Sequence, residues 1–122
     1  MNRVRIVGGE FRRRQLRFPD SAGLRPTPDR VRETLFNWLG QDLSGWQCLD
    51  LFAGSGALGF EAASRGAEKV VMVEKAAPVL AALQANHALL HYPASVQIWR
   101  GDALQYLDST TARFDLVFID PP

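Results

Sequence analysis

The chain has 122 residues with 14 basic and 13 acidic side chains, so its formal net charge is +1. That length predicts one domain, and the single cysteine, Cys48, excludes an intrachain disulfide. No apolar stretch approaches the roughly 18 residues of a membrane-spanning helix, and the basic start lacks the continuous apolar stretch of a signal peptide. We therefore expect a cytoplasmic protein without membrane association.

Charge is unevenly distributed along the chain. Residues 1–40 contain nine Arg and four acidic residues, whereas residues 41–122 contain five basic and nine acidic residues. Apolar residues interleave with the first arginines, which favours a short β-hairpin turning at Gly8-Gly9 over disorder. Because a planar guanidinium binds two phosphate oxygens at once, such an arm suits phosphate contacts, although a merely solvated hairpin also fits the charge pattern. The arginines concerned are Arg12, Arg13, Arg14 and Arg17.

The clearest helix is predicted from Thr27 to Gly40. Thr27 can cap its first turn, Pro28 suits the first turn, and Gly40 ends it. Apolar residues at helical spacing predict its buried stripe, which consists of Val31, Leu35, Trp38 and Leu39. We expect this helix to brace a sheet formed by the rest of the chain.

A strand, a glycine-rich loop and a second helix follow. Trp46–Leu49 is predicted as a buried strand, and Ser55–Arg65 as a helix stopped by Gly66. Between them, the spacing G-x-G-x-x-G is met by Gly54, Gly56 and Gly59. This spacing predicts a nucleotide cofactor but does not choose one, because nicotinamide and flavin sites share it.

Two acidic residues follow the next predicted strands. Glu74 ends a strand over Lys69–Val73, where its carboxylate can accept hydrogen bonds from ribose hydroxyls. Asp102 follows a strand near Val96–Trp99. It can accept from an adenine amino group, or cap the short helix predicted over Ala103–Leu107.

Asp50 distinguishes between two kinds of nucleotide cofactor. At the mouth of the glycine loop, its carboxylate would repel a pyrophosphate by about 4 kcal/mol per unit charge at ~4 Å and an effective dielectric constant of ~20. The same carboxylate would favour the ammonium and sulfonium groups of S-adenosylmethionine. The sequence therefore favours this methyl donor over a dinucleotide.

The last three residues, Asp120-Pro121-Pro122, follow the apolar run Phe114–Ile119, which we predict as a strand buried on both faces. Each proline lacks an N–H and holds the residue before it extended, so the Asp120 carboxylate and the Pro121 carbonyl can point at one spot. An exocyclic amine that attacks a methyl group needs two such acceptors, because its nitrogen gains positive charge in the transition state. A proline-rich turn without chemistry is the alternative.

In this order the motifs resemble those of class I S-adenosylmethionine-dependent methyltransferases. The segments 6–12 and 23–39 are more specific and are similar to RsmD-type bacterial 16S ribosomal RNA guanine-N2 methyltransferases, over essentially the whole chain. The resemblance implies a Rossmann-like α/β sheet with helices on both faces, preceded by a basic β-hairpin arm. It also implies methyl transfer to the N2 amine of a guanine in 16S rRNA, within the small ribosomal subunit or its assembly intermediate.

The resemblance implies roles for individual residues. Asp120 and Pro121 would hold the target amine, with Pro122 completing the catalytic motif. The residues that would hold the cofactor are Asp50, Phe52, Gly54, Gly56, Glu74 and Asp102. RNA would contact the four arm arginines named above, and also Arg25 and Arg30. We expect residues 1–22 to form the arm and residues 23–122 the N-terminal portion of the S-adenosylmethionine-binding domain, in a monomer.

Two departures from the family pattern stand out. An aromatic residue is expected after the second proline, and the family sheet has about seven strands against four predicted here, which would leave the last strand as an exposed edge. We therefore expect a truncated chain that is inactive as it stands.

Three other hypotheses stay open: a non-catalytic RNA-binding fragment, methyl transfer to adenine N6 or cytosine N4, and a nicotinamide-dependent oxidoreductase. No metal is expected, because His87 and His91 have no third ligand.

Overall fold

A computed structural model describes residues 2–20 and 27–121 of the chain. Arg25 and Pro122, both predicted site residues, lie outside these ranges. Within them, the elements in chain order are β1 (Asn2–Arg5), β2 (Gln15–Phe18), α1 (Asp29–Trp38), β3 (Gln47–Asp50), α2 (Ala57–Ser64), β4 (Lys69–Glu74), α3 (Ala77–Leu89), β5 (Val96–Arg100), α4 (Ala103–Ser109) and β6 (Leu116–Phe118).

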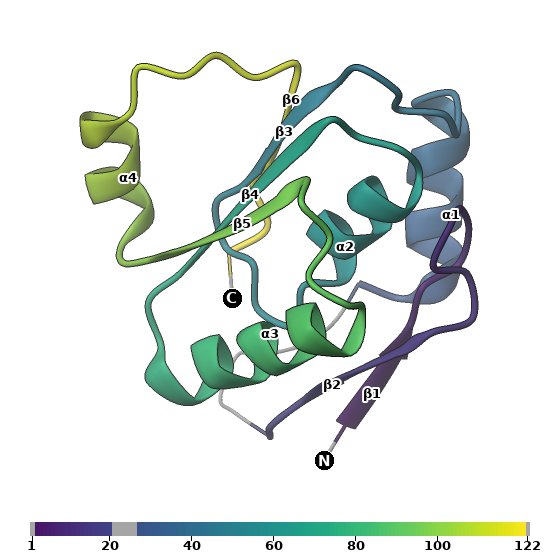
Figure 1. The fold of residues 1–122 in the computed structure, drawn as a ribbon, viewed down its shortest axis with the longest axis horizontal. Coiled ribbons are helices and arrows are strands. Elements are labelled where there is room, and N and C mark those ends of the chain that lie inside the picture. Colours follow the sequence, from purple (N-terminus) through teal and green to yellow (C-terminus); the bar gives the residue numbers. More distant parts are fainter. Residues whose placement is uncertain (1, 21–26, 122) are drawn as a thin grey trace.

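The central sheet consists of four parallel strands in the order β5-β4-β3-β6 (Figure 1). The chain runs from β3 outward to β4 and β5, and then returns to place β6 on the other side of β3. All four carboxyl ends therefore lie at one edge, and the strand order reverses beside β3. In open α/β sheets, ligands bind at such a reversal point.

Side chains alternate between the two faces of this sheet and build two hydrophobic clusters. Cys48, Val70 and Met72 belong to the larger cluster, with residues of α1, α2, α3 and the hairpin β1–β2. Val71 and Val73 belong to the smaller one, with α4. The prediction of an α/β sheet with helices on both faces is thus confirmed. Within the described residues, no helix is both long and apolar enough to cross a membrane.

The hairpin is present, but its predicted turn is wrong. β1 pairs antiparallel with β2, with Val4 opposite Leu16, and residues 6–14 connect the two strands. This connection is longer than a two-residue turn because it packs on α2. The N–H of Glu10 donates to the carbonyl of Ser64 at 2.7 Å. At Gly9, where φ is +80°, a Cβ atom would lie 2.0 Å from that same carbonyl oxygen, so only glycine fits this contact.

The structure of helix α1 differs from the prediction in its bounds, its cap and its buried residues. The helix is shorter than Thr27–Gly40, and Thr27 makes no capping hydrogen bond to it. Half of the predicted apolar stripe is wrong: Leu35 and Leu39 pack against the larger hydrophobic cluster, but Val31 and Trp38 do not. Val31 and Trp38 are 51% and 81% exposed, whereas the fully buried residues are Arg32 and Phe36. An apolar pattern places charged residues outside by default, but Arg32 finds enough acceptors in the interior to be buried.

Strand β6 lies at the edge of the sheet, as predicted from the strand count. The prediction that it is buried on both faces is wrong. Phe118 is buried, but Val117 is 41% exposed on the opposite side. The apolar run predicted a two-sided strand because composition does not reveal whether a neighbour covers each face. Two helix ranges also change: α2 is shorter than Ser55–Arg65, and α4 extends beyond Leu107.

Candidate active site

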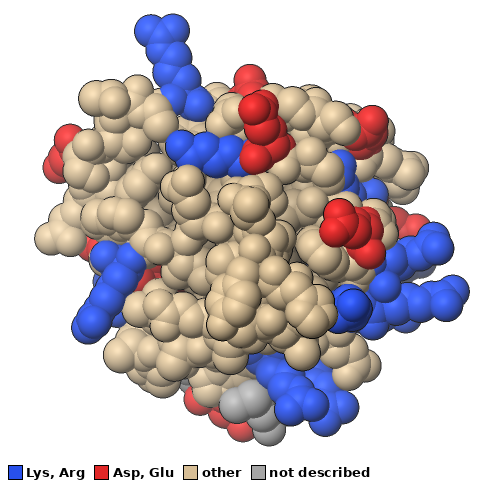
Figure 2. Space-filling model, viewed as in Figure 1, with Lys and Arg blue, Asp and Glu red and all other residues tan. Residues whose placement is uncertain are grey.

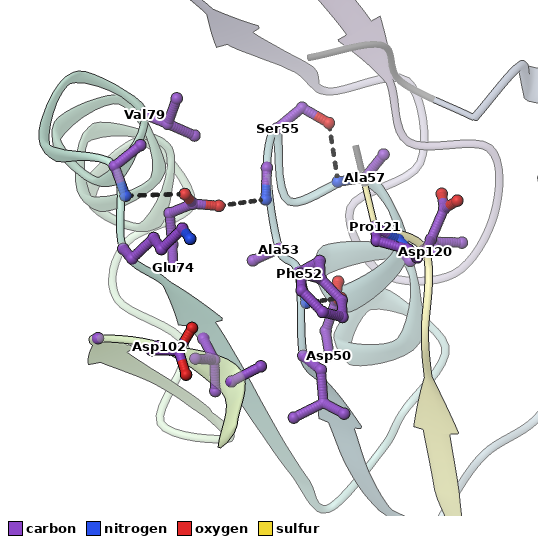
Figure 3. A pocket seen from close by; sticks show the side chains of 18 of the residues that line it. Asp50, Phe52, Ala53, Ser55, Ala57, Glu74, Val79, Asp102, Asp120 and Pro121 are labelled. Carbon is purple, nitrogen blue, oxygen red and sulfur yellow. Dashed lines mark hydrogen bonds between the residues drawn. The ribbon is translucent and has the colours of Figure 1, made fainter. Parts of the chain in front are cut away.

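A cavity of about 490 Å³ opens at the carboxyl edge of the sheet, where the strand order reverses. Figure 3 shows that side chains from the ends of different strands surround it. The predicted site residues among its lining are Asp50, Phe52, Gly54, Glu74, Asp102, Asp120 and Pro121. The volume lies in the range of small-molecule sites. The fold therefore brings together at one cavity seven residues that are spread over 72 positions of the sequence.

The glycine loop shapes one wall of this cavity. It follows β3 and turns into α2 at Gly56, which has a φ of +85° and precedes the first helical residue. A Cβ atom at Gly56 would lie 2.5 Å from the ring of Phe60. Gly56 is therefore needed for the turn and for close packing of the helix, and it is absent from the cavity lining. Its predicted direct contact with a cofactor stays a prediction.

Glu74 holds the glycine loop in place. One carboxylate oxygen accepts from the N–H of Gly54 at 2.9 Å, and the other accepts from the N–H of Ala76 at 3.0 Å (Figure 3). These bonds join the end of β4 to the loop after β3 and to the start of α3. Each oxygen keeps a second acceptor position, so the carboxylate can still accept from a ribose hydroxyl.

Asp50 is a buried carboxylate at the end of β3, only 1% exposed. Burial raises the pKa of Asp50 from 3.8 to about 7. The hydrogen bond from the Phe52 N–H, at 3.3 Å, lowers the pKa and so opposes this shift, whereas the negative charge of Asp120 raises it further. A cationic ligand in the cavity would reverse this balance and favour the ionised form. The carboxylate is thus suited to a positively charged group.

The predicted helix cap by Asp102 is confirmed, and its contact with an adenine amino group stays a prediction. Its Oδ2 accepts from the N–H of Leu104 at 3.0 Å and caps α4. The residue also lines the cavity. The second carboxylate oxygen has no part in the cap, so the capping bond leaves an acceptor for a ligand.

Asp120 and Pro121 follow β6 on the side of the cavity opposite Glu74 (Figure 3). Both residues are exposed. The hydroxyl of Thr27 donates to Asp120 Oδ2 at 3.1 Å, although the two residues are 93 positions apart. Thr27 also lines the cavity. The sequence predicts Thr27 only as a helix cap, and no local pattern predicts this contact.

Of the predicted RNA-contacting arginines, the five that the structure describes lie outside the cavity lining. Those that the structure describes are all exposed: Arg12, Arg13 and Arg14 in the hairpin connection, Arg17 on β2 and Arg30 on α1. In Figure 2, several basic side chains project from the lower right of the molecule, where Figure 1 places the hairpin. Their contact with RNA stays a prediction.

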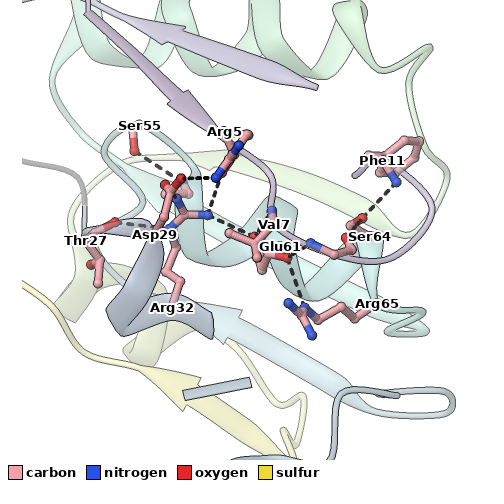
Figure 4. A network of polar contacts seen from close by, with 12 residues as sticks. Arg5, Val7, Phe11, Thr27, Asp29, Arg32, Ser55, Glu61, Ser64 and Arg65 are labelled. Carbon is pink, nitrogen blue, oxygen red and sulfur yellow. Dashed lines mark hydrogen bonds and ion pairs between the residues drawn. The ribbon is translucent and has the colours of Figure 1, made fainter. Parts of the chain in front are cut away.

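Figure 4 shows a buried ionic network that sequence analysis missed. Glu61 of α2 is fully buried and pairs with Arg32 and Arg65, each at 2.9 Å. It also accepts from the N–H groups of Val7 and Gly8 in the hairpin connection, at 2.8 and 2.9 Å. One carboxylate therefore joins α1, α2 and the hairpin. The spacing of Glu61 and Arg65 on one helix face was the only local indication of it.

The parallel sheet has a glycine loop after β3 and an acidic residue at the end of β4, and solved methyltransferases superpose on it, so the fold is that of class I S-adenosylmethionine-dependent methyltransferases. Within this class, the chain belongs to the family described as "Conserved hypothetical protein 95", whose model matches residues 4–122. The resemblance noted in the sequence is thereby confirmed.

Curated relatives agree with this assignment. The chain is 47% identical over 119 residues to the ribosomal RNA small subunit methyltransferase D of Escherichia coli K12, covering 98% of the chain and 60% of the relative. It is 45% identical over 122 residues to the protein of the same name from Haemophilus influenzae, covering 98% of the chain and 63% of the relative. The chain thus spans about three fifths of the length of these relatives.

Solved structures share the fold. The protein yhhF of Escherichia coli superposes with a TM-score of 0.89 and 43% identity, over 99% of this chain and 65% of that one. A Trypanosoma brucei PRMT1 enzyme-prozyme complex with AdoHcy superposes with a TM-score of 0.59 and 26% identity, over 73% of this chain and 28% of that one.

Proposed function

We propose that the complete protein transfers a methyl group from S-adenosylmethionine to the N2 amine of a guanine in 16S rRNA of the small ribosomal subunit. The observation that carries the proposal is the convergence of three acidic side chains and the Asp120-Pro121 pair on one cavity. The small-subunit rRNA substrate is inferred from the names of the curated relatives. The choice of guanine N2 rests on the family resemblance.

The cavity residues fit the cofactor by the chemistry of their donor and acceptor groups. Asp50 provides a buried negative charge for a cationic group, Glu74 provides acceptors for ribose hydroxyls, and Asp102 provides one for an adenine amino group. A pyrophosphate would gain no such charge pairing, because Asp50 would have to be protonated to lie beside it. This arrangement therefore favours the methyl donor over a dinucleotide.

When bound, S-adenosylmethionine would supply an electrophilic methyl carbon. The amine lone pair would form the new C–N bond while the C–S bond breaks and its electron pair stays on sulfur. The Asp120 carboxylate and the Pro121 carbonyl each accept a hydrogen bond from the amine, and together they orient its lone pair. Their partial negative charge stabilises the positive charge that develops on nitrogen, and one proton then leaves to water. The target base must be extruded from its stack to reach this position.

The test is Asp120→Ala in the complete protein, with Asp108→Ala, an exposed position on α4, as the matched control. Methyl transfer from labelled S-adenosylmethionine to unmodified small-subunit particles is measured in single turnover. We expect a loss of about 100-fold or more for Asp120→Ala, and none for the control. Undiminished turnover of Asp120→Ala would refute the proposal, as would tighter calorimetric binding of NAD than of S-adenosylhomocysteine to the unaltered protein.

A further inference from the structure

Thr27 connects the segment before α1 to the candidate catalytic aspartate. Its hydroxyl donates to Asp120 Oδ2 at 3.1 Å. Helix α1 begins after Pro28 without any side-chain capping bond, so this hydroxyl is not used by the helix. Thr27 also lines the cavity together with Asp120 and Pro121. Its side chain is therefore placed to act on the site rather than on the helix that follows it.

The backbone of Thr27 is itself held from the interior of the protein. Arg32 Nε donates to the carbonyl of Thr27 at 3.1 Å, and Arg32 is fully buried (Figure 4). The same guanidinium donates to the carbonyl of Arg5 at 2.8 Å and pairs with the buried carboxylate of Glu61. Because Arg32 and Glu61 are both inaccessible to solvent, their pairing gives Thr27 a fixed position at the rim of an otherwise open site.

Asp120 needs such a partner. It is exposed and follows a three-residue edge strand, so little else restricts the rotation of its carboxylate. A donor on one oxygen selects one orientation of the group and leaves the other oxygen for a hydrogen of the target amine. Misplacement of a reacting group by about 1 Å can reduce a rate by about 100-fold.

From these contacts we infer that Thr27 is a positioning residue for methyl transfer, acting through Asp120. This inference rests on the proposed function, since it assumes that Asp120 holds the target amine. It assigns to the hydroxyl of Thr27 a role in kcat and none in cofactor binding. The methyl group of Thr27 is not required, so serine should serve at this position and valine should not.

The test compares Thr27→Val, which keeps the shape and removes the hydroxyl, with Thr27→Ser, which keeps the hydroxyl. Both are made in the complete protein, alone and together with Asp120→Ala. For Thr27→Val we expect kcat to fall about 10-fold to 100-fold, while the affinity for S-adenosylhomocysteine and the melting temperature stay unchanged. Thr27→Ser should keep most of the activity. In the Asp120→Ala background, Thr27→Val should reduce the rate less than 2-fold further.

The outcomes separate the two proposals. Loss of turnover in Asp120→Ala with unaltered kcat in Thr27→Val would overturn the role of Thr27 and leave the proposed function intact. Equal loss in the valine and serine variants, or a full additional loss in the double variant, would also overturn it, because either result would show an effect that does not pass from the hydroxyl to Asp120. Undiminished turnover of Asp120→Ala would instead refute the proposed function.

Discussion

Replacing Asp50 by asparagine should stabilise the protein and weaken its binding of the methyl donor. The amide keeps the size of the carboxylate and an oxygen that can accept from the Phe52 N–H, but it carries no charge. Burial raises the pKa of Asp50 from 3.8 to about 7. At ~1.4 kcal/mol per pH unit, this difference corresponds to about 4 kcal/mol of free energy against the ionised form in the folded protein.

The sign of the effect follows from proton binding. Between about pH 4 and pH 7 the folded protein keeps the proton on Asp50 and the unfolded chain has lost it, so the free energy of unfolding decreases as the pH rises. Above pH 7 both states are ionised and the loss is complete. Asp50→Asn should therefore match the unaltered protein near pH 4 and exceed its stability by up to about 4 kcal/mol at pH 8.

The affinity for the methyl donor should rise with pH, whereas the free energy of unfolding falls. A cationic group beside Asp50 favours the ionised carboxylate, so the affinity of the unaltered protein for S-adenosylmethionine should rise between pH 6 and pH 8. Asp50→Asn should lose this dependence and bind about 10-fold to 100-fold more weakly at pH 8, as expected when one charged hydrogen-bonding partner is removed.

Urea unfolding and titration calorimetry at pH 4 to 8 measure both effects in the complete protein, with Asp108→Asn as the exposed control. Two results would each refute the argument. One is an Asp50→Asn variant that is less stable than the unaltered protein at pH 8. The other is a variant that binds the methyl donor with unaltered affinity at that pH.

Two further predictions concern the buried network and the basic hairpin. Glu61→Gln removes the counter-charge of the buried Arg65 guanidinium and leaves Arg32 paired only with the partly exposed Asp29. We therefore expect a loss of about 3 to 5 kcal/mol in urea unfolding, against less than about 0.5 kcal/mol for the exposed Glu33→Gln. Equal stability of the two variants would contradict the role of the network. For the hairpin, replacing Arg12, Arg13 or Arg14 by alanine should weaken RNA binding and reduce the slope of log K against log salt by about 0.7 to 0.9 per lost phosphate contact. Arg113→Ala, exposed outside the hairpin, is the control, and unaltered slopes for all three arm variants would refute the phosphate contacts.

Much of the sheet and of its ligand edge could be predicted from short-range patterns. The strands β3, β4 and β5 lie within one or two residues of their predicted ranges, because each is an apolar run bounded by turn residues. The glycine spacing and the acidic residue 20 positions beyond Gly54 also depend only on neighbours in the sequence. Since parallel strands all point to one edge, these elements sufficed to predict that Asp50, Glu74 and Asp120 would meet.

Only the tertiary structure determines which polar groups are buried and which partners they pair with. Burial of a charged side chain such as Arg32 is unfavourable unless the charge is paired. Its partner Glu61 lies 29 positions away, and hydrophobic periodicity carries no information about such a pair. The predicted hairpin turn at Gly8-Gly9 is wrong for a similar reason. The N–H groups of this segment find acceptors on α2, and Glu61, the acceptor for Gly8, lies 53 positions away.

The site residues show the same distinction between what local sequence determines and what the tertiary structure determines. Local patterns determine which elements carry Asp50 and Asp120, because strands and turns form from neighbouring residues. The raised pKa of Asp50 and the hydroxyl partner of Asp120 depend on long-range packing, which removes water from one carboxylate and brings Thr27 across 93 positions to the other. Desolvation and hydrogen bonding act through space, so they are defined only once the chain has folded.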